Sequence, residues 1–420
     1  MNVADSREYK LALEGYSFTP SETPFDTDLL IVNTCSVRAK AEEKLVSFLG
    51  AAEAAIATNP RLKVGLVGCT ATLKGDELRR RFPAIKFILP ATDVEGFAVR
   101  LLEQFPGLSP FALEGQPSVD EQERFERFIT VMRGCDSFCA YCVVPYARGP
   151  VRSLPLGDIF ARCDAAVEAG CKVITLLGQN VMAYGRNAVD AANTPVSFLE
   201  LLREIAERYP DTWIKFLTSH PRDVTRELVD FIARNPNISR HFHLPIQSGD
   251  DRVLSDMNRG YTSTDYRGLI EYIREKIPDS RISTDMIAGF PTEDDEAFQN
   301  TLTLARELGF EQMFTFQYSP RQGTAAAKWE DPVPFEEKRK RLEKLIELQN
   351  EIVRKKHHAL IGKRMPALVY GVAEKVKGVA AVSRESHVII LADADIKPGT
   401  IVDVEITEGL QRTLRGIVAR

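Results

Sequence analysis

One segment of the sequence combines three cysteines with glycine, aromatic residues and proline: Arg133-Gly134-Cys135-Asp136-Ser137-Phe138-Cys139-Ala140-Tyr141-Cys142-Val143-Val144-Pro145-Tyr146. Its thiols have the spacing C-x3-C-x2-C, and thiolates are soft ligands that suit iron-sulfur clusters and zinc. A structural zinc normally has a fourth Cys or His nearby, whereas the next candidates along the chain are Cys163 and His220. The spacing therefore favours one iron-sulfur cube whose fourth iron is open to a small molecule. A three-thiolate zinc site and three unrelated core cysteines are the alternatives.

The cysteine segment lies between the apolar run 128–132 and a turn rich in proline, glycine and arginine. This arrangement predicts a loop that follows a strand. In barrels and open sheets, ligands bind at that end of the strands.

Composition gives a broad frame for the protein. The chain has 420 residues, 44% of them hydrophobic, which predicts two or three domains with cores of their own. It contains no uncharged apolar stretch of about eighteen residues, and its first residues lack the apolar core of a signal peptide. We therefore expect no membrane association and a cytoplasmic location.

Seven cysteines, three of them clustered, favour metal ligation in a reducing compartment over disulfides. The net charge of -5 argues against nucleic-acid binding driven by charge alone.

Residues 1–112 have the pattern of a small α/β domain. Buried-strand runs are expected at 29–34, 64–68 and 85–89, with a helix at 41–57. Cys35 and Cys69 follow the first two strands, at the edge where open α/β sheets gather ligands. Because buried cysteine is common, these two thiols could equally be structural.

Residues 113–124 have the composition of a linker, and a regular alternation of strand and helix follows over 125–357. Six such units predict a parallel sheet in an α/β domain, and they form a partial, open barrel because eight would be needed for closure. The expected strands are 128–132, 173–177, 213–218, 241–246, 281–287 and 312–318. The expected helices are 156–169, 198–208, 225–234, 265–276 and 294–308. Four further residues are expected to be structural: Cys163, Cys171, His220 and His243.

The C-terminal part has a different pattern. Residues 334–356 predict a long, solvated helix in which basic residues alternate with glutamates. Five short strands within 358–420 predict a small β-barrel of the oligonucleotide-binding type.

The cysteine segment, with Tyr141 before its last cysteine, resembles the signature of the radical S-adenosylmethionine enzymes. The string Cys-Val-Val-Pro-Tyr-Ala-Arg-Gly, from Cys142 to Gly149, narrows the resemblance to the methylthiotransferases. The resemblance implies a 4Fe-4S cluster on Cys135, Cys139 and Cys142, with S-adenosylmethionine bound to the open iron. It also implies a cofactor pocket with these walls: Gln179, Gln247, Ser248, Ile287 and Gly289.

Two further motifs resemble the N-terminal domain of that family, which binds an auxiliary 4Fe-4S cluster through three thiolates. They are Asn33-Thr34-Cys35-Ser36-Val37-Arg38 and Val67-Gly68-Cys69-Thr70-Ala71. The family's first cysteine lies in a Gly-Cys-Gln-Met-Asn motif, whereas this sequence opens with Met1-Asn2. We infer that Met1-Asn2 is the tail of that motif and that the sequence starts too late, so the third ligand is missing. Two thiolates alone are expected to hold a cluster poorly.

Within the family, three segments are most similar to the tRNA 2-methylthio-N6-isopentenyladenosine synthases: 33–44, 179–185 and 244–249. The resemblance implies that a 5'-deoxyadenosyl radical abstracts the hydrogen on C2 of the adenine next to the anticodon, and that the auxiliary cluster donates sulfur. It implies tRNA and a reductant such as flavodoxin or ferredoxin as partners, no acid-base pair, and a C-terminal barrel similar to the RNA-binding TRAM domain. We expect a monomer.

Other functions fit parts of the same pattern. Sister groups act on threonylcarbamoyladenosine in tRNA or on an aspartate of a ribosomal protein. A different radical S-adenosylmethionine enzyme could use the N-terminal domain only to bind its substrate. A non-enzymatic RNA-binding protein with a zinc site is a further alternative.

Overall fold

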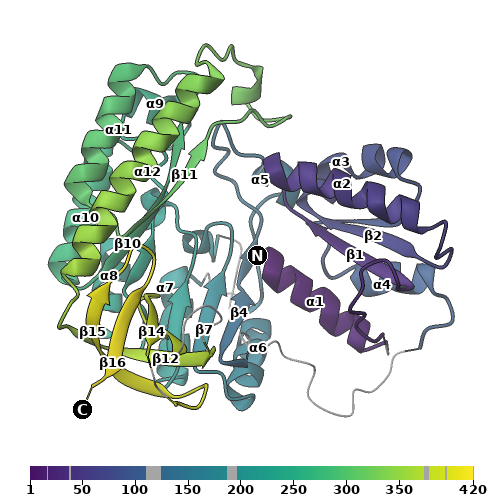
Figure 1. The fold of residues 1–420 in the computed structure, drawn as a ribbon, viewed down its shortest axis with the longest axis horizontal. Coiled ribbons are helices and arrows are strands. Elements are labelled where there is room, and N and C mark those ends of the chain that lie inside the picture. The colour runs from purple at the N-terminus through teal and green to yellow at the C-terminus, as the bar shows by residue number, and fades with distance from the viewer. Residues whose placement is uncertain are drawn as a thin grey trace. The chain divides into compact units, whose positions relative to one another are not determined.

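The computed structural model describes residues 1–16, 18–36, 39–109, 124–186, 196–372, 378–392 and 395–419. The chain divides into two compact units (Figure 1). Unit 1 comprises Met1–Val119, Met132–Arg152 and Arg321–Ala327, and unit 2 comprises Asp120–Val131, Ser153–Pro320 and Lys328–Arg420. Of the predicted linker, residues 113–123 lie outside the described residues.

Unit 1 contains a three-stranded parallel sheet in the order β1 (Leu29–Thr34), β2 (Lys63–Gly68) and β3 (Ile85–Pro90). Helices cover both of its faces, so these strands are nearly continuous apolar runs. One face packs Leu66 and Ile85 against the helices on that side. The other packs Phe87 and Leu89 against helical Tyr9 and Phe97. The helices are α1 (Asn2–Glu14), α2 (Ala39–Ala55), α3 (Cys69–Arg81) and α4 (Phe97–Gln104).

The cysteine segment follows the short strand β5 (Met132–Arg133) and belongs to unit 1. It leads into the single-turn helix α5 (Val144–Arg148), and the two-residue strand β6 (Arg152–Ser153) comes next in the chain. Pro145 lies in the first turn of α5, where its missing N–H would have no intrahelical partner anyway.

Unit 2 contains six parallel strands, as the sequence predicts. Three form the sheet β4-β7-β8 and three form β9-β10-β11, and a bridge between Ile214 and Ile238 continues the wall from one sheet to the other. The strands are β4 (Glu126–Thr130), β7 (Val173–Leu177), β8 (Trp213–Phe216), β9 (His241–His243), β10 (Arg281–Ala288) and β11 (Gln312–Gln317). The wall is open, which confirms the predicted partial barrel.

Most helices between these strands begin where the sequence offers a capping side chain, whereas the helix that begins after Pro155 has none. Ser197 and Thr262 each accept a hydrogen bond from the backbone three residues later and form full capping boxes. The helices are α6 (Leu156–Glu168), α7 (Phe198–Arg208), α8 (Arg226–Arg234), α9 (Asp251–Asp256), α10 (Ser263–Lys276) and α11 (Asp295–Leu308). Short 3-10 turns lie at Val181–Ala183, Pro221–Asp223 and Ala326–Lys328.

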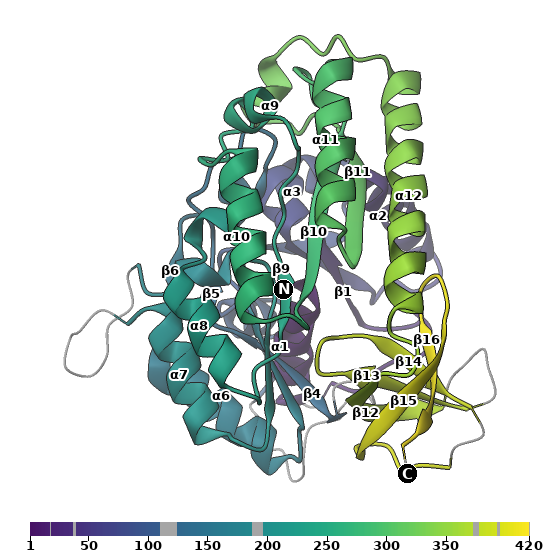
Figure 2. The ribbon, with the colours of Figure 1, turned by 90° about the vertical axis from the view of Figure 1, so that its left-hand side faces the viewer.

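The long helix α12 (Phe335–His358) runs beside α11 and covers β10 and β11 (Figure 2). The prediction of a merely solvated helix is wrong for one face, because Leu345, Leu348 and Ile352 are buried. Two of its basic residues, Lys338 and Arg341, are buried as well. Arg341 pairs with Glu337 of its own helix and also with Glu293 and Asp295. The charge pattern did not indicate this burial, because Glu293 and Asp295 belong to a distant segment of unit 2. None of the helices in the described part of the chain is long and apolar enough to cross a membrane.

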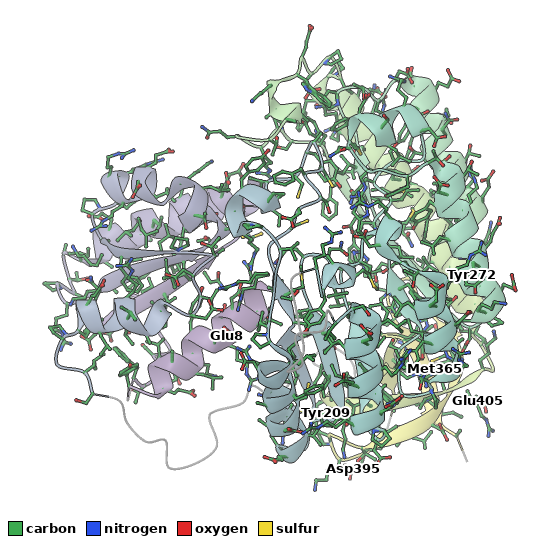
Figure 3. All side chains as sticks on the ribbon, turned by 180° about the vertical axis from the view of Figure 1, so that it is seen from behind. Glu8, Tyr209, Tyr272, Met365, Asp395 and Glu405 are labelled. Atoms are coloured by element: carbon green, nitrogen blue, oxygen red, sulfur yellow. The ribbon has the colours of Figure 1, made fainter. Side chains whose placement is uncertain are left out.

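The C-terminal strands close into a five-stranded barrel, as predicted. Their order is β12 (Arg364–Val372), β13 (Val379–Ser383), β14 (Val388–Leu391), β16 (Leu414–Val418) and β15 (Ile401–Gly409). Figure 3 labels Met365 and Glu405 on this barrel. Leu368 packs with Val173 and Trp213, near the amino ends of β7 and β8. The barrel is therefore joined to the end of the parallel strands opposite their carboxyl ends.

Candidate functional site

The cysteine segment is a loop whose two ends are tied together. The Cys135 N–H donates to the Gly149 carbonyl at 3.1 Å. Gly134 has φ +78°, and a Cβ there would lie 1.8 Å from the Pro150 carbonyl oxygen, so glycine is required at this close approach. Inside the loop, the Cys142 N–H donates to the Cys139 carbonyl at 2.9 Å and forms a turn between these cysteines. The backbone thus gathers the three thiols in one tight loop.

The surroundings of the loop are partly open. Cys139 is buried, whereas Cys135 and Cys142 are half-buried. Phe138 and Tyr146 are exposed large side chains and meet edge-on, with ring centroids 6.1 Å apart. The loop therefore keeps one thiol inside and leaves aromatic groups on its surface.

The donor set fits an iron-sulfur cube. The described residues include all seven cysteines, and none of them is in a disulfide. Within that described part, no three His, Cys, Asp or Glu side chains are arranged to hold a single metal ion. A cube ligated by three cysteines needs no such arrangement, because each thiolate binds a different iron.

Cys35 and Cys69 are brought together by the sheet of unit 1. They follow Thr34 and Gly68, which pair directly across β1 and β2. The Thr34 hydroxyl donates to the Val67 carbonyl at 2.7 Å and accepts from the Thr70 N–H at 3.1 Å, which fixes the chain around Cys69. Burial raises the pKa of the Cys69 thiol, while the neighbouring Arg148 guanidinium opposes that rise.

A buried network of charges lies beside Cys69 in unit 1. Asp5 of α1 contacts two arginines, Arg133 through Oδ1 at 2.5 Å and Arg148 through Oδ2 at 2.9 Å. Glu8, labelled on α1 in Figure 3, adds a contact to Arg133 at 3.1 Å. Asn2 accepts from Arg148 at 2.9 Å. The two arginines flank the cysteine loop, so this network ties both of its ends to α1.

Arg148 belongs to the string from Cys142 to Gly149 that resembles the methylthiotransferases. It is 5% exposed and pairs with Asp5. Asp5 and Arg133 carry no motif, so sequence reasoning missed them. The one signal in the sequence is that Arg133 stands next to the cysteine segment.

The predicted cofactor residues belong to unit 2 and lie at or after the carboxyl ends of parallel strands. Gln179 comes after β7, and its buried Oε1 has no hydrogen-bond partner among the described residues. Gln247 has φ +77°; its N–H donates to the Asp285 carbonyl and its carbonyl accepts from the Ile287 N–H, each at 2.9 Å. Gln247 and Ile287 are thus joined, and Gln179 supplies an unsatisfied polar atom on the same edge.

Ser248 and Gly289 have clear structural duties in the same region. The Ser248 hydroxyl is fully buried, lies 3.3 Å from the Thr301 hydroxyl, and accepts from the Asp250 N–H. At Gly289 the φ is +74°, and a Cβ would lie 2.3 Å from Lys338 Cγ. The absence of a side chain at Gly289 is therefore required by α12, which the sequence did not indicate.

Glu293 is a residue of this region that sequence reasoning missed. It is 2% exposed and its Oε1 accepts from the Gly289 N–H at 2.7 Å and from Arg341 Nη1 at 3.0 Å. Burial raises the pKa of the Glu293 carboxyl, and both donors oppose the rise. The sequence offered one local indication of this role: Glu293 is an acidic residue four positions after Gly289, which follows a strand.

Gly289 is a predicted wall of the S-adenosylmethionine pocket, and Glu293 is the acceptor of its buried N–H. Replacing Glu293 by alanine is expected to displace this wall and to weaken binding of S-adenosylmethionine by roughly tenfold, since a buried N–H without an acceptor costs about 1–3 kcal/mol. Calorimetric titration of the cofactor into the reconstituted protein measures the effect. Glu296→Ala, at an exposed position of α11, is the control. Equal affinity of the Glu293 variant and the native protein would exclude a positioning role for this carboxylate.

Four residues predicted to be structural fit that role to different degrees. Cys163 is fully buried on α6, and burial raises the pKa of its thiol to about 12. Cys171 is also buried. The buried His220 accepts from the Arg222 N–H, and burial lowers its pKa to about 2. His243 Nδ1 lies 3.0 Å from Ser283 Oγ.

The fold and the cysteine loop define a radical S-adenosylmethionine protein. Residues 129–305 match the radical SAM superfamily, and residues 1–90 match the uncharacterized protein family UPF0004. A solved structure of a radical S-adenosylmethionine methyltransferase from Kitasatospora setae, with cobalamin and a 4Fe-4S cluster bound, is similar in fold. Its TM-score is 0.54 at 15% identity, covering 76% of this chain and 68% of that one.

Curated relatives extend the similarity over the whole chain. The tRNA-2-methylthio-N(6)-dimethylallyladenosine synthase of Carboxydothermus hydrogenoformans is 37% identical over 100% of this chain and 97% of its own length. The synthases of Dictyoglomus thermophilum and Citrifermentans bemidjiense are 36% and 34% identical over 100% and 99% of this chain, and each match covers 96% of the relative. The chain belongs to the family of tRNA-2-methylthio-N(6)-dimethylallyladenosine synthases.

Proposed function

We propose that this chain replaces the hydrogen on C2 of N6-dimethylallyladenosine in tRNA with a methylthio group. The dimethylallyl group is the isopentenyl group of the sequence-based prediction. One observation carries the proposal: a loop with three thiols and a second pair of cysteines at neighbouring strand ends occur in one chain. Full-length relatives that bear this activity in their names support it.

In this proposal Cys135, Cys139 and Cys142 hold a 4Fe-4S cluster, and Cys35 and Cys69 are two ligands of a second one. When bound, the first cluster would supply the electron that cleaves S-adenosylmethionine and yields a radical. A radical is needed because the C2–H bond of the adenine has no useful acidity. The chain itself supplies the thiolates and the walls of the cofactor pocket. The proposed walls are Gln179, Gln247, Ser248, Ile287 and Gly289.

The charge network has a part in the same chemistry. Arg148 places a positive charge beside the Cys69 thiol and is itself held by Asp5. A thiolate binds metal only after losing its proton, and a neighbouring cation favours the thiolate. Arg148 therefore assists cluster binding at Cys69.

The partners follow from the activity. The target adenosine lies in the anticodon loop, where bases can be splayed out and stacked on aromatic side chains. The C-terminal barrel is the proposed RNA-binding element, as small barrels of this kind bind oligonucleotides. A flavodoxin or a ferredoxin would deliver the electron, and we place a monomeric protein in the cytoplasm, where tRNA is modified.

The test starts from the chain reconstituted anaerobically with iron and sulfide. Two clusters predict about eight iron per chain and one predicts about four. The reconstituted protein is then incubated with S-adenosylmethionine, a reductant and an anticodon stem-loop RNA that carries N6-dimethylallyladenosine. Mass spectrometry of the nucleosides is expected to show the C2-methylthio product.

Several results would contradict the proposal. Zinc without iron would exclude the radical chemistry. Four iron with cofactor cleavage but no product would restrict this chain to the first half of the reaction. Product formed on threonylcarbamoyladenosine, or on a ribosomal protein, in place of N6-dimethylallyladenosine would assign the substrate to a sister group.

A further inference from the structure

In unit 2 one face of β9, β10 and β11 carries an aromatic ring beside a carboxylate. Side chains alternate between the faces of a strand. Ser283 pairs with His243 across β10 and β9. Asp285, on the same face as Ser283, pairs with Phe314 across β10 and β11. We call the face that bears His243, Asp285 and Phe314 the inner face.

Contacts between these side chains agree with the register. His243 Nδ1 lies 3.0 Å from Ser283 Oγ, and His243 Nε2 lies 3.6 Å from Asp285 Oδ1. The rings of His243 and Phe314 meet edge-on, with centroids 5.8 Å apart. Ser283 and His243 therefore set the position of the Asp285 carboxylate and of the Phe314 ring.

The inner face of β11 is accessible, whereas the opposite face is covered by α12. Met313 points to that covered face and is 6% exposed, while the next residue, Phe314, is 40% exposed. The Asp285 side chain is 27% exposed. Within the described part of the chain the Asp285 carboxylate accepts no hydrogen bond; Oδ1 faces His243 Nε2, and Oδ2 is available to a donor.

These side chains lie beside the proposed cofactor walls. The Asp285 carbonyl accepts from the Gln247 N–H, and the Gln247 carbonyl accepts from the Ile287 N–H. Ile287 follows Asp285 by two residues on the inner face, a step of about 6–7 Å along a strand. A flat ligand over Phe314 would therefore lie next to a cofactor held at Gln247 and Ile287.

We propose that Phe314 and Asp285 form the binding subsite for the N6-dimethylallyladenine base, with His243 as the residue that positions Asp285. This inference rests on the proposed function and names the residues that select its substrate. The Phe314 ring packs on the flat base and its apolar dimethylallyl group, because aromatic side chains stack on unpaired bases. The Asp285 carboxylate, which only accepts hydrogen bonds when ionised, takes the single N6–H of the substituted base.

The chemistry of the base fits this pair of side chains. The ring nitrogens of adenine are acceptors, so an ionised carboxylate can meet the base only at its N6–H edge. That edge also carries the dimethylallyl group. The Asp285 carboxylate therefore recognises the N6–H, and the neighbouring Phe314 ring recognises the dimethylallyl group.

The test measures methylthiolation of the anticodon stem-loop RNA by three variants at Phe314. Phe314→Ala is expected to raise KM for this RNA by roughly 5- to 150-fold, the range that loss of one base–aromatic stack gives. Phe314→Leu keeps apolar bulk without a ring and is expected to behave like alanine. Phe314→Tyr keeps the ring and is expected to have the KM of the native chain. Asp285→Ala is expected to weaken binding of the RNA with N6-dimethylallyladenosine and of the RNA with unmodified adenosine, because both bases donate an N6–H, and binding of the two RNAs measures the effect.

Two controls separate loss of the subsite from loss of the fold. The iron content and the thermal unfolding of the three Phe314 variants are measured beside KM, and both are expected to match those of the native chain. Phe335→Ala, at an exposed phenylalanine at the start of α12, is expected to leave KM unchanged.

If the native chain forms the product and Phe314→Ala has the same KM, the subsite is elsewhere. If Phe314→Leu behaves like the native chain, stacking is excluded. If the native chain forms no product, the proposed function itself fails.

Discussion

Replacing Cys135, Cys139 and Cys142 together by alanine is expected to abolish formation of 5'-deoxyadenosine and to remove about four iron per chain. The physical reason is that these thiols are gathered by one backbone loop, which the Cys135–Gly149 hydrogen bond closes. Without thiolates the loop offers no soft ligand, and the electron for cofactor cleavage has no source. Iron and sulfide analysis and chromatography of the nucleoside measure the two effects.

Cys163→Ala is the matched control for this triple variant. Cys163 is fully buried on α6, and its thiol has a pKa raised to about 12 by burial, so it is a poor ligand at neutral pH. We expect its substitution to leave iron content and cofactor cleavage unchanged. If the triple variant retained all the iron, other residues would have to hold the first cluster.

Replacing Asp5 by alanine is expected to lower the free energy of unfolding by about 3–5 kcal/mol. Asp5 is 1% exposed and contacts both Arg133 and Arg148, which are 3% and 5% exposed. Its removal leaves two buried guanidinium groups with less compensation, and Glu8 contacts only the first of them in this network. Urea denaturation followed by circular dichroism measures the loss.

Glu103→Ala provides the comparison, because it removes an ion pair with Arg100 that is about half exposed. A surface pair of this kind contributes about 0–1 kcal/mol. The double variant Asp5→Ala, Arg148→Met is expected to recover part of the loss, since it removes one of the uncompensated charges. A loss of under 1 kcal/mol for Asp5→Ala alone would show that the network contributes little to stability.

The strands and most of the helices were predictable because their signals are local. The run 173–177 is apolar throughout and became β7 with the same bounds, and 198–208 became α7 with a Ser197 capping box. The long helix was also predicted, but its buried face was not. Helix α1 was not predicted, because Asn2–Glu14 has only a weak apolar stripe and is stabilised by charges elsewhere in unit 1.

The strand–helix alternation indicated the fold class, and the spacing of Cys135, Cys139 and Cys142 indicated a cluster loop, because neighbouring residues encode both features. The family was recognised from the resemblance of sequence motifs. The residue assignments at the site are predictions that the experiments above address. Burial and pairing of charges became known only from the folded chain. Asp5 and Arg133 stand 128 positions apart, and Glu293 and Arg341 stand 48 apart. No local pattern marks such partners, because a charge is stabilised in the interior by whichever opposite charge the fold brings to it.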